Sequence, residues 1–95
     1  MTWLSALKDR KAAAIMKTRI DRLRFGLFGD AKHLDSDVYE LRVHYGPGYR
    51  IYFTKQEDTL VVLLCGGDKS SQNKDIKKSI VYCKLLKDAN DAKTS

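Results

Sequence analysis

The segment at residues 39–53, which reads YELRVHYGPGYRIYF, limits the possible fold more than any other part of the chain. It contains two runs in which apolar and polar residues alternate, joined by Gly46-Pro47-Gly48. Glycine tolerates positive φ and proline cannot sit inside a paired strand, so the joining residues indicate a turn. We therefore predict a β-hairpin whose side chains alternate between its two faces.

The two faces of the predicted hairpin differ in polarity. One face holds aromatic and aliphatic side chains and is expected to belong to the core: Tyr39, Leu41, Val43, Tyr45, Tyr49, Ile51 and Phe53. The other face is expected to be the polar one, and it gathers Arg42, His44, Arg50 and Tyr52.

Helical periodicity precedes the hairpin. Apolar residues recur at spacings of three and four from Ala13 to Leu23, and Gly26 is expected to end this helix. A shorter helical turn before it makes the N-terminal part a predicted helical hairpin, with Trp3, Leu4 and Leu7 in the first helix. Residues 27–37 are rich in turn-forming residues and are predicted to be a loop.

The region after the hairpin predicts one more strand and one more helix. Residues 60–65, LVVLLC, are apolar without alternation, as in a strand covered on both faces, so we expect this strand at the centre of the sheet. Ser70 and Ser71 are candidate N-caps of a final helix with apolar residues at helical spacing. The chain after about Lys87 is expected to be loose.

Composition restricts the partners and the compartment. The 95 residues suffice for a single domain, residues 1–95. The net charge of +6 favours a polyanionic partner or an acidic protein, and the alternative is a merely soluble basic domain.

Cys65 and Cys83 lack a CxxC spacing and are expected to be reduced core cysteines of a cytosolic protein. Neither a signal peptide nor a membrane span is apparent, so we expect a cytoplasmic protein.

Three cations on or near the hairpin form a candidate phosphate site. Arg42 and Arg50 carry planar, charged forks that match phosphate oxygens bidentately, and Lys69 follows the last strand as a third cation. The alternative interpretation is an exposed basic sheet face that Glu40 balances across the hairpin.

Candidate proton carriers lie close to these cations. His44 suits general acid or base chemistry, although a lone histidine on a strand can equally be structural. Asp75 in the first turn of the final helix is explained by the helix dipole, yet it could face the same cleft as Lys69. Tyr52 could stack on a nucleic-acid base.

Motifs of several other chemistries are absent from the sequence. There is no GxxxxGK[ST] loop, no HExxH and no GxSxG. His33 has no second ligand at a helical or strand interval, so we predict no metal site. The remaining chemistry needs cations and a proton carrier but no metal, and cleavage of RNA by its own 2′-hydroxyl fits this requirement.

Four segments of the chain resemble the RelE/ParE superfamily of type II toxins, in particular its HigB-like, phage-derived addiction module killer branch. They are WLSALKD, RIDRLRFGLFGDAKHL, VYELRVHYGPGYRIYF and LLCGGDKSSQNKDI, in that order. The resemblance implies an α+β fold in which an N-terminal helical hairpin packs on a small, mostly antiparallel twisted sheet with a C-terminal helix. It also implies a metal-independent endoribonuclease, an mRNA interferase that cuts mRNA in the ribosomal A site without a cofactor. The implied partners are the ribosome, mRNA and a cognate antitoxin, commonly a HigA-like helix-turn-helix protein.

The resemblance also implies roles for individual residues, because family nucleases use basic residues on the strands and near the final helix. Arg50 would stabilise the pentacovalent phosphate, and His44 or Asp75 would carry the proton. The expected catalytic residues are thus Arg50, Lys69, His44 and Asp75, and the expected RNA-binding residues are Arg42, Arg50, Lys69 and Tyr52.

The chain departs from the family pattern in two places. Relatives begin with a strand before the first helix, whereas this sequence begins MTWLSALKD. A C-terminal Tyr or Asp-Tyr-His group that some relatives use is replaced here by SSQNKDI. Two alternatives therefore stay open: a ParE-like inhibitor of DNA gyrase that acts by protein binding, and an inactive toxin remnant.

Overall fold

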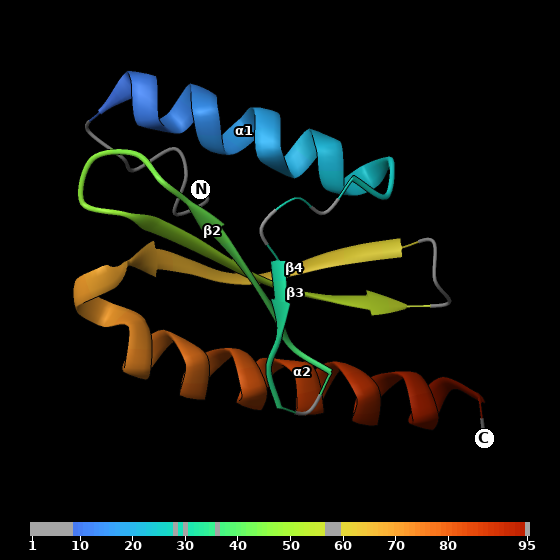
Figure 1. Cartoon of the computed structure of the whole chain (residues 1–95). Coiled ribbons are helices and arrows are strands. Elements are labelled where there is room, and N and C mark those ends of the chain that lie inside the picture. The colour runs from blue at the N-terminus through green and yellow to red at the C-terminus, as the bar shows by residue number, and fades with distance from the viewer. Residues whose placement is uncertain (1–8, 28, 30, 36, 57–59, 95) are drawn as a thin grey trace.

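The computed structural model describes residues 9–94 apart from 28, 30, 36 and 57–59, and it contains two helices around a sheet (Figure 1). The sheet is antiparallel, with the strand order β1-β2-β3-β4. The elements in chain order are α1 (Arg10–Arg24), β1 (Ala31–His33), β2 (Tyr39–Val43), β3 (Tyr49–Gln56), β4 (Leu60–Asp68), the 3₁₀ helix η2 (Lys69–Ser71) and α2 (Gln72–Thr94). The predicted α+β class and the predicted hairpin, β2–β3, are confirmed.

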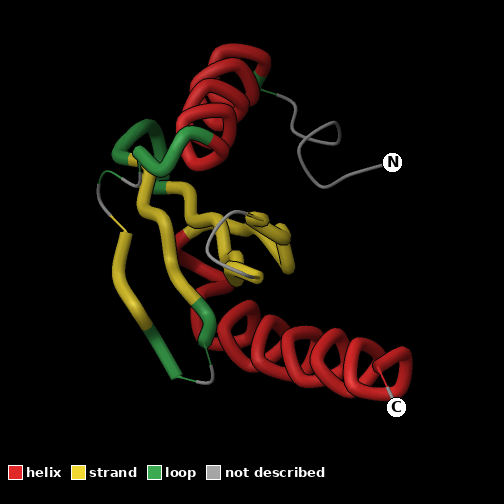
Figure 2. Tube along the Cα trace, turned by 90° about the vertical axis from the view of Figure 1, so that its right-hand side faces the viewer, coloured by secondary structure: helices red, strands yellow, loops and turns green. Residues whose placement is uncertain are grey.

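The sheet lies between α1 on one face and α2 on the other (Figures 1 and 2). The α1 side contains every residue of the predicted core face of the hairpin, with Tyr39 and Tyr45 partly buried. The α2 side buries a second cluster, to which Val38, Tyr52 and Cys83 belong. The expectation that this second face is simply polar is therefore wrong for its part under α2, where the helix covers the sheet and excludes the solvent.

Helix α1 begins and ends where its sequence provides capping groups. The Asp9 side chain accepts hydrogen bonds from the backbone N–H groups of Lys11 and Ala12, which satisfies two amides that lack a helical partner. The helix ends before Gly26, whose φ of 77° lies in the left-handed region. The other helix of the predicted N-terminal hairpin, around Trp3, lies outside the described residues.

Strand β1 lies within the segment that was predicted to be a loop. Its three residues pair with β2 in the register Ala31↔Leu41, Lys32↔Glu40 and His33↔Tyr39. Such a short strand has no readable alternation of its own, and its conformation depends on hydrogen bonds offered by the neighbouring strand. The loop prediction for this part is therefore wrong.

Among the described strands β4 lies at an edge of the sheet, so its predicted central position is wrong for this part of the chain. A β-bulge interrupts its pairing with β3, because Tyr52 pairs with Cys65 whereas Phe53 pairs with Leu63. As a result Leu64 and Cys65 both pack against the α2-side cluster, and Leu63 remains 48% exposed. The bulge breaks the alternation that would have marked a half-exposed strand.

The connection from β4 to α2 begins at Asp68. Its carboxylate accepts hydrogen bonds from the backbone N–H and the hydroxyl of Ser70, so Asp68 rather than Ser70 or Ser71 caps η2. Helix α2 then continues to Thr94, and the predicted loose tail is helical. An ion pair between Lys87 and Asp37 ties this helix to the loop before β2.

Candidate active site

A concavity of about 430 Å³ lies at the turn between β2 and β3. Four of the predicted site residues line it together: Arg42, His44, Arg50 and Lys69. The turn itself completes the lining, with Val43, Tyr45, Gly46, Pro47, Gly48 and Tyr49. A basic concavity of this kind can hold an anion.

The sheet register and the turn bring these cations together. Arg42 and Arg50 are direct partners across β2 and β3. The backbone N–H of Lys69 donates a hydrogen bond to the carbonyl oxygen of Gly48 at 3.0 Å, which fixes the start of η2 against the turn. Gly48 has a φ of 84°, a conformation that glycine adopts without strain.

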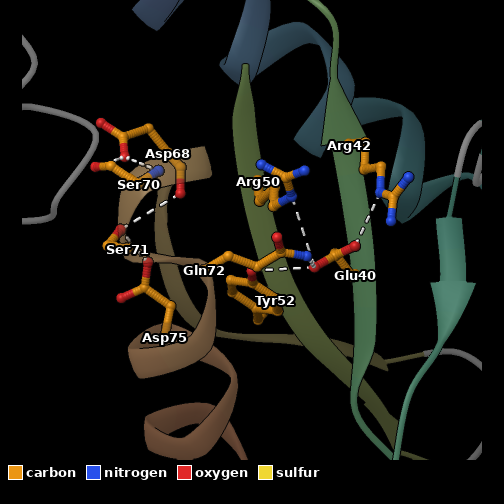
Figure 3. A network of polar contacts seen from close by, with 9 residues as sticks. All are labelled: Glu40, Arg42, Arg50, Tyr52, Asp68, Ser70, Ser71, Gln72 and Asp75. Atoms are coloured by element: carbon orange, nitrogen blue, oxygen red, sulfur yellow. Dashed lines mark hydrogen bonds and ion pairs between the residues drawn. The ribbon is translucent and has the colours of Figure 1, made fainter. Parts of the chain in front are cut away.

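Glu40 connects the two arginines of the concavity to Tyr52 and Gln72 (Figure 3). Its side chain is 1% exposed, and Oε1 accepts a hydrogen bond from Arg42 Nε at 3.0 Å. Oε2 accepts hydrogen bonds from the Tyr52 hydroxyl and from Gln72 Nε2, each at 3.1 Å. Arg50 Nε lies 3.7 Å from the same oxygen. Like charges directly opposite on two strands repel, so this buried carboxylate stabilises the facing arginines.

Hydrogen bonding keeps the Glu40 carboxylate ionised despite its burial. Burial raises the pKa of Glu40, but the hydrogen bonds from Arg42, Gln72 and Tyr52 outweigh it and hold the pKa below its ordinary value. Burial and the charge of Glu40 in turn raise the pKa of Tyr52, which therefore remains a hydrogen-bond donor. Because its oxygens are occupied by donors, Glu40 is suited to hold the arginines and not to accept a proton.

Arg50 and Arg42 differ in their surroundings. The Arg42 side chain is 40% exposed, whereas the Arg50 side chain is 11% exposed. The Nε atom of Arg50 is buried and makes no hydrogen bond within the described part of the chain. At 3.7 Å its ion pair with Glu40 is too long for a hydrogen bond. Arg50 therefore lines the concavity as a largely desolvated cation that a bound anion could approach.

Two predicted site residues do not lie in the concavity. Asp75 is 7% exposed, accepts a hydrogen bond from the Ser71 hydroxyl and lies 3.8 Å from Cys65 Sγ. It is not among the residues that line the concavity. Burial, together with the Asp75 charge, raises the pKa of the Cys65 thiol. Tyr52 is fully buried beneath α2, so the prediction that its ring stacks on a nucleic-acid base is wrong for this structure.

Gly67 provides the space that the Asp75 carboxylate occupies. A Cβ at this position would lie 2.0 Å from Asp75 Oδ2 and 2.6 Å from Ser71 Oγ. We expect Gly67→Ala to lower the free energy of unfolding by about 1 to 3 kcal/mol, measured by urea denaturation, because buried Asp75 must move. If the cost of Gly67→Ala were equally large in an Asp75→Ala background, the contact with Asp75 would not be its cause.

The described residues give no sign of a metal site. No three His, Cys, Asp or Glu side chains among them lie close enough to hold a metal ion.

Both cysteines are free; Cys83 is buried and Cys65 is partly buried, as expected for core cysteines. Within the same described part of the chain, no helix is long and apolar enough to cross a membrane.

Comparison with known proteins places the chain in a family. The family model described as "Phage derived protein Gp49-like (DUF891)" matches residues 2–84. An uncharacterized protein of Haemophilus influenzae is 53% identical over 85 residues, which cover 90% of this chain and 86% of that protein. No solved structure matched the chain. The chain therefore belongs to the phage-derived Gp49-like family, a toxin-like family in the broad RelE/HigB class.

Proposed function

We propose that this chain is the toxin of a type II toxin-antitoxin system and an mRNA interferase that cuts mRNA on the ribosome. The observation that carries the proposal is the convergence of Arg42, His44, Arg50 and Lys69 on one concavity. Three cations and a histidine suit an RNA phosphodiester, which is anionic and gains charge on its oxygens during cleavage. Membership of a toxin-like family supports the same assignment.

Besides the RNA and the protein, the reaction needs only water as a source of one proton. His44 accepts the proton of a ribose 2′-hydroxyl, and the 2′-oxygen forms a bond to the adjacent phosphorus. The bond from phosphorus to the 5′-oxygen of the next nucleotide then breaks, and that oxygen takes up a proton from water. The products are a 2′,3′-cyclic phosphate and a 5′-hydroxyl end.

The cations have different roles in this mechanism. Arg50 is the best placed to stabilise the pentacovalent phosphate, because its guanidinium is desolvated and already oriented by Glu40. Arg42 and Lys69 hold adjacent phosphates of mRNA or ribosomal RNA at the rim. Of the two residues expected to carry the proton, the geometry favours His44, since Asp75 lies outside the lining.

The partners follow from the same charge distribution. A cognate helix-turn-helix antitoxin, HigA-like, silences the toxin by placing carboxylates at the concavity or by blocking its entry to the ribosome. The net charge of +6 would speed association with such an acidic partner. The toxin acts in the cytoplasm, where ribosomes and mRNA are found.

A reconstituted translation reaction tests the proposed chemistry. Purified protein added to translating ribosomes is expected to cut the mRNA in phase with the codons and to leave 5′-hydroxyl and 2′,3′-cyclic phosphate ends. The same mRNA without ribosomes is the control and is expected to stay intact. Ends with a 5′-phosphate and a 3′-hydroxyl would contradict attack by the 2′-hydroxyl.

A further inference from the structure

The outer side of α2 carries an exposed apolar patch that the proposed active site does not use. Val81 is 55% exposed, Tyr82 is 42% exposed and Leu85 is 60% exposed. They lie within about one helical turn of one another. In Figures 1 and 2 no other described element lies against this side of the helix. We refer to these three residues as the α2 patch.

The helical period separates the patch from the buried side of α2. Ser79 and Cys83 are buried toward the sheet. With 3.6 residues per turn, Val81 and Leu85 lie on the opposite side from Cys83. None of the residues that line the concavity belongs to α2, and the β2–β3 turn lies at the other end of the molecule from the C-terminus of the helix (Figure 1).

Positive charge surrounds the patch. Helical spacing continues the ridge of Val81 and Leu85 toward the N-terminus through Lys78 and Lys74. Among the side chains that the structure describes, four exposed lysines surround the patch and Asp88 is the one carboxylate beside it. The lysines are Lys74, Lys77, Lys78 and Lys84. The surface thus combines an apolar centre with a cationic rim.

We propose that the α2 patch and its lysines bind an acidic amphipathic helix of a protein partner. An apolar stripe on such a helix covers Val81, Tyr82 and Leu85, and its flanking carboxylates meet the lysines. Two copies of this chain would bring lysines against lysines, which disfavours self-association through the patch. The phosphates of a nucleic acid would pair with the lysines, but they would offer no apolar surface to cover Val81 and Leu85. The proposal does not depend on the function proposed above.

The test uses the full chain and a synthetic peptide of about 20 residues, long enough to form a helix, with a leucine stripe flanked by glutamates. Binding is followed by fluorescence anisotropy and by amide chemical shifts of the labelled protein. We expect Val81→Gln with Leu85→Gln to weaken binding about tenfold or more, since both side chains are buried on contact. We expect Lys77→Gln with Lys78→Gln to weaken binding and to reduce its sensitivity to salt. Phe25→Gln with Leu27→Gln, which removes apolar side chains that are 82% and 61% exposed, is the matched control and should bind as the native protein does.

Four other outcomes would overturn the proposal. The first is failure of the peptide to bind, and the second is binding that the control variant loses and the α2 variants keep. The third is a dimer of the free chain that Val81→Gln with Leu85→Gln abolishes, because a second copy would then be the occupant. The fourth is a short oligouridylate that shifts the amides around Leu85 while the peptide does not, because a nucleic acid would then be the occupant.

Discussion

Replacing Arg50 by alanine is expected to lower ribosome-dependent mRNA cleavage by about 10²- to 10³-fold, the usual cost of losing one donor to a developing anionic charge. The substitution removes a desolvated guanidinium from the concavity. Initial cleavage rates in the translation reaction measure the effect, with circular dichroism to check that the variant folds. Full activity of Arg50→Ala would remove this residue from the site.

Two further variants separate the chemistry of Arg50 from its charge. Arg50→Lys keeps the charge but loses the planar fork, so we expect a cleavage rate between those of the alanine variant and the native protein. Arg24→Ala is the matched control, because Arg24 is an exposed arginine in the last turn of α1, outside the concavity. Equal losses for Arg24→Ala and Arg50→Ala would point to overall charge instead of a specific site.

Replacing Glu40 by glutamine is expected to lower the free energy of unfolding by about 2 to 3 kcal/mol at neutral pH. The variant keeps the shape of the side chain but leaves Arg42 and Arg50 facing each other without a counterion. The expected loss is smaller than for a fully buried pair because Arg42 reaches the solvent. Urea denaturation measures it, and Asp88→Asn, at an exposed carboxylate of α2, is the control with little expected effect.

The stabilisation by Glu40 should also depend on pH with a definite sign. Its pKa in the folded protein is lower than its ordinary value of 4.5, so the folded state favours the ionised form. The difference in stability between the native protein and Glu40→Gln should therefore be fully present above about pH 4.5 and should shrink as the pH falls through the folded pKa. Asp37 and Asp68, whose pKa values are also lowered, titrate in both proteins and cancel from the difference. A difference that stayed constant in acid would contradict this assignment.

Local patterns were sufficient to predict the hairpin and the cation cluster. The alternation in residues 39–53 fixed which side chains share a face, and the Gly-Pro-Gly turn fixed where the strands reverse. These two features place Arg42 opposite Arg50. The cationic residue after the last strand, Lys69, was also predicted correctly as a neighbour, because the strand and the turn meet there.

Features that depend on tertiary packing could not be read from the sequence in the same way. Glu40 looked like a surface counterion, but Gln72, which lies 32 positions further along the chain, closes over it and buries it. Tyr52 occupies a polar-face position in the alternation, yet α2 covers it. The bulge in β4 disrupts the alternation from which its edge position could have been predicted. The capping role of Asp68 and the burial of Asp75 depend on where the chain turns from β4 into α2. The burial of Glu40 and of Tyr52 thus depends on how α2 packs on the sheet, and the position of β4 depends on strand pairing.

The position and chemistry of mRNA 5′ ends after brief induction of the protein in cells test the central claim most directly. The account predicts new 5′-hydroxyl ends in phase with codons, which are lost with Arg50→Ala and kept with Arg24→Ala. Intact transcripts together with an SOS response would contradict it and would favour inhibition of DNA gyrase. Intact transcripts without any growth arrest would also contradict it and would favour an inactive toxin.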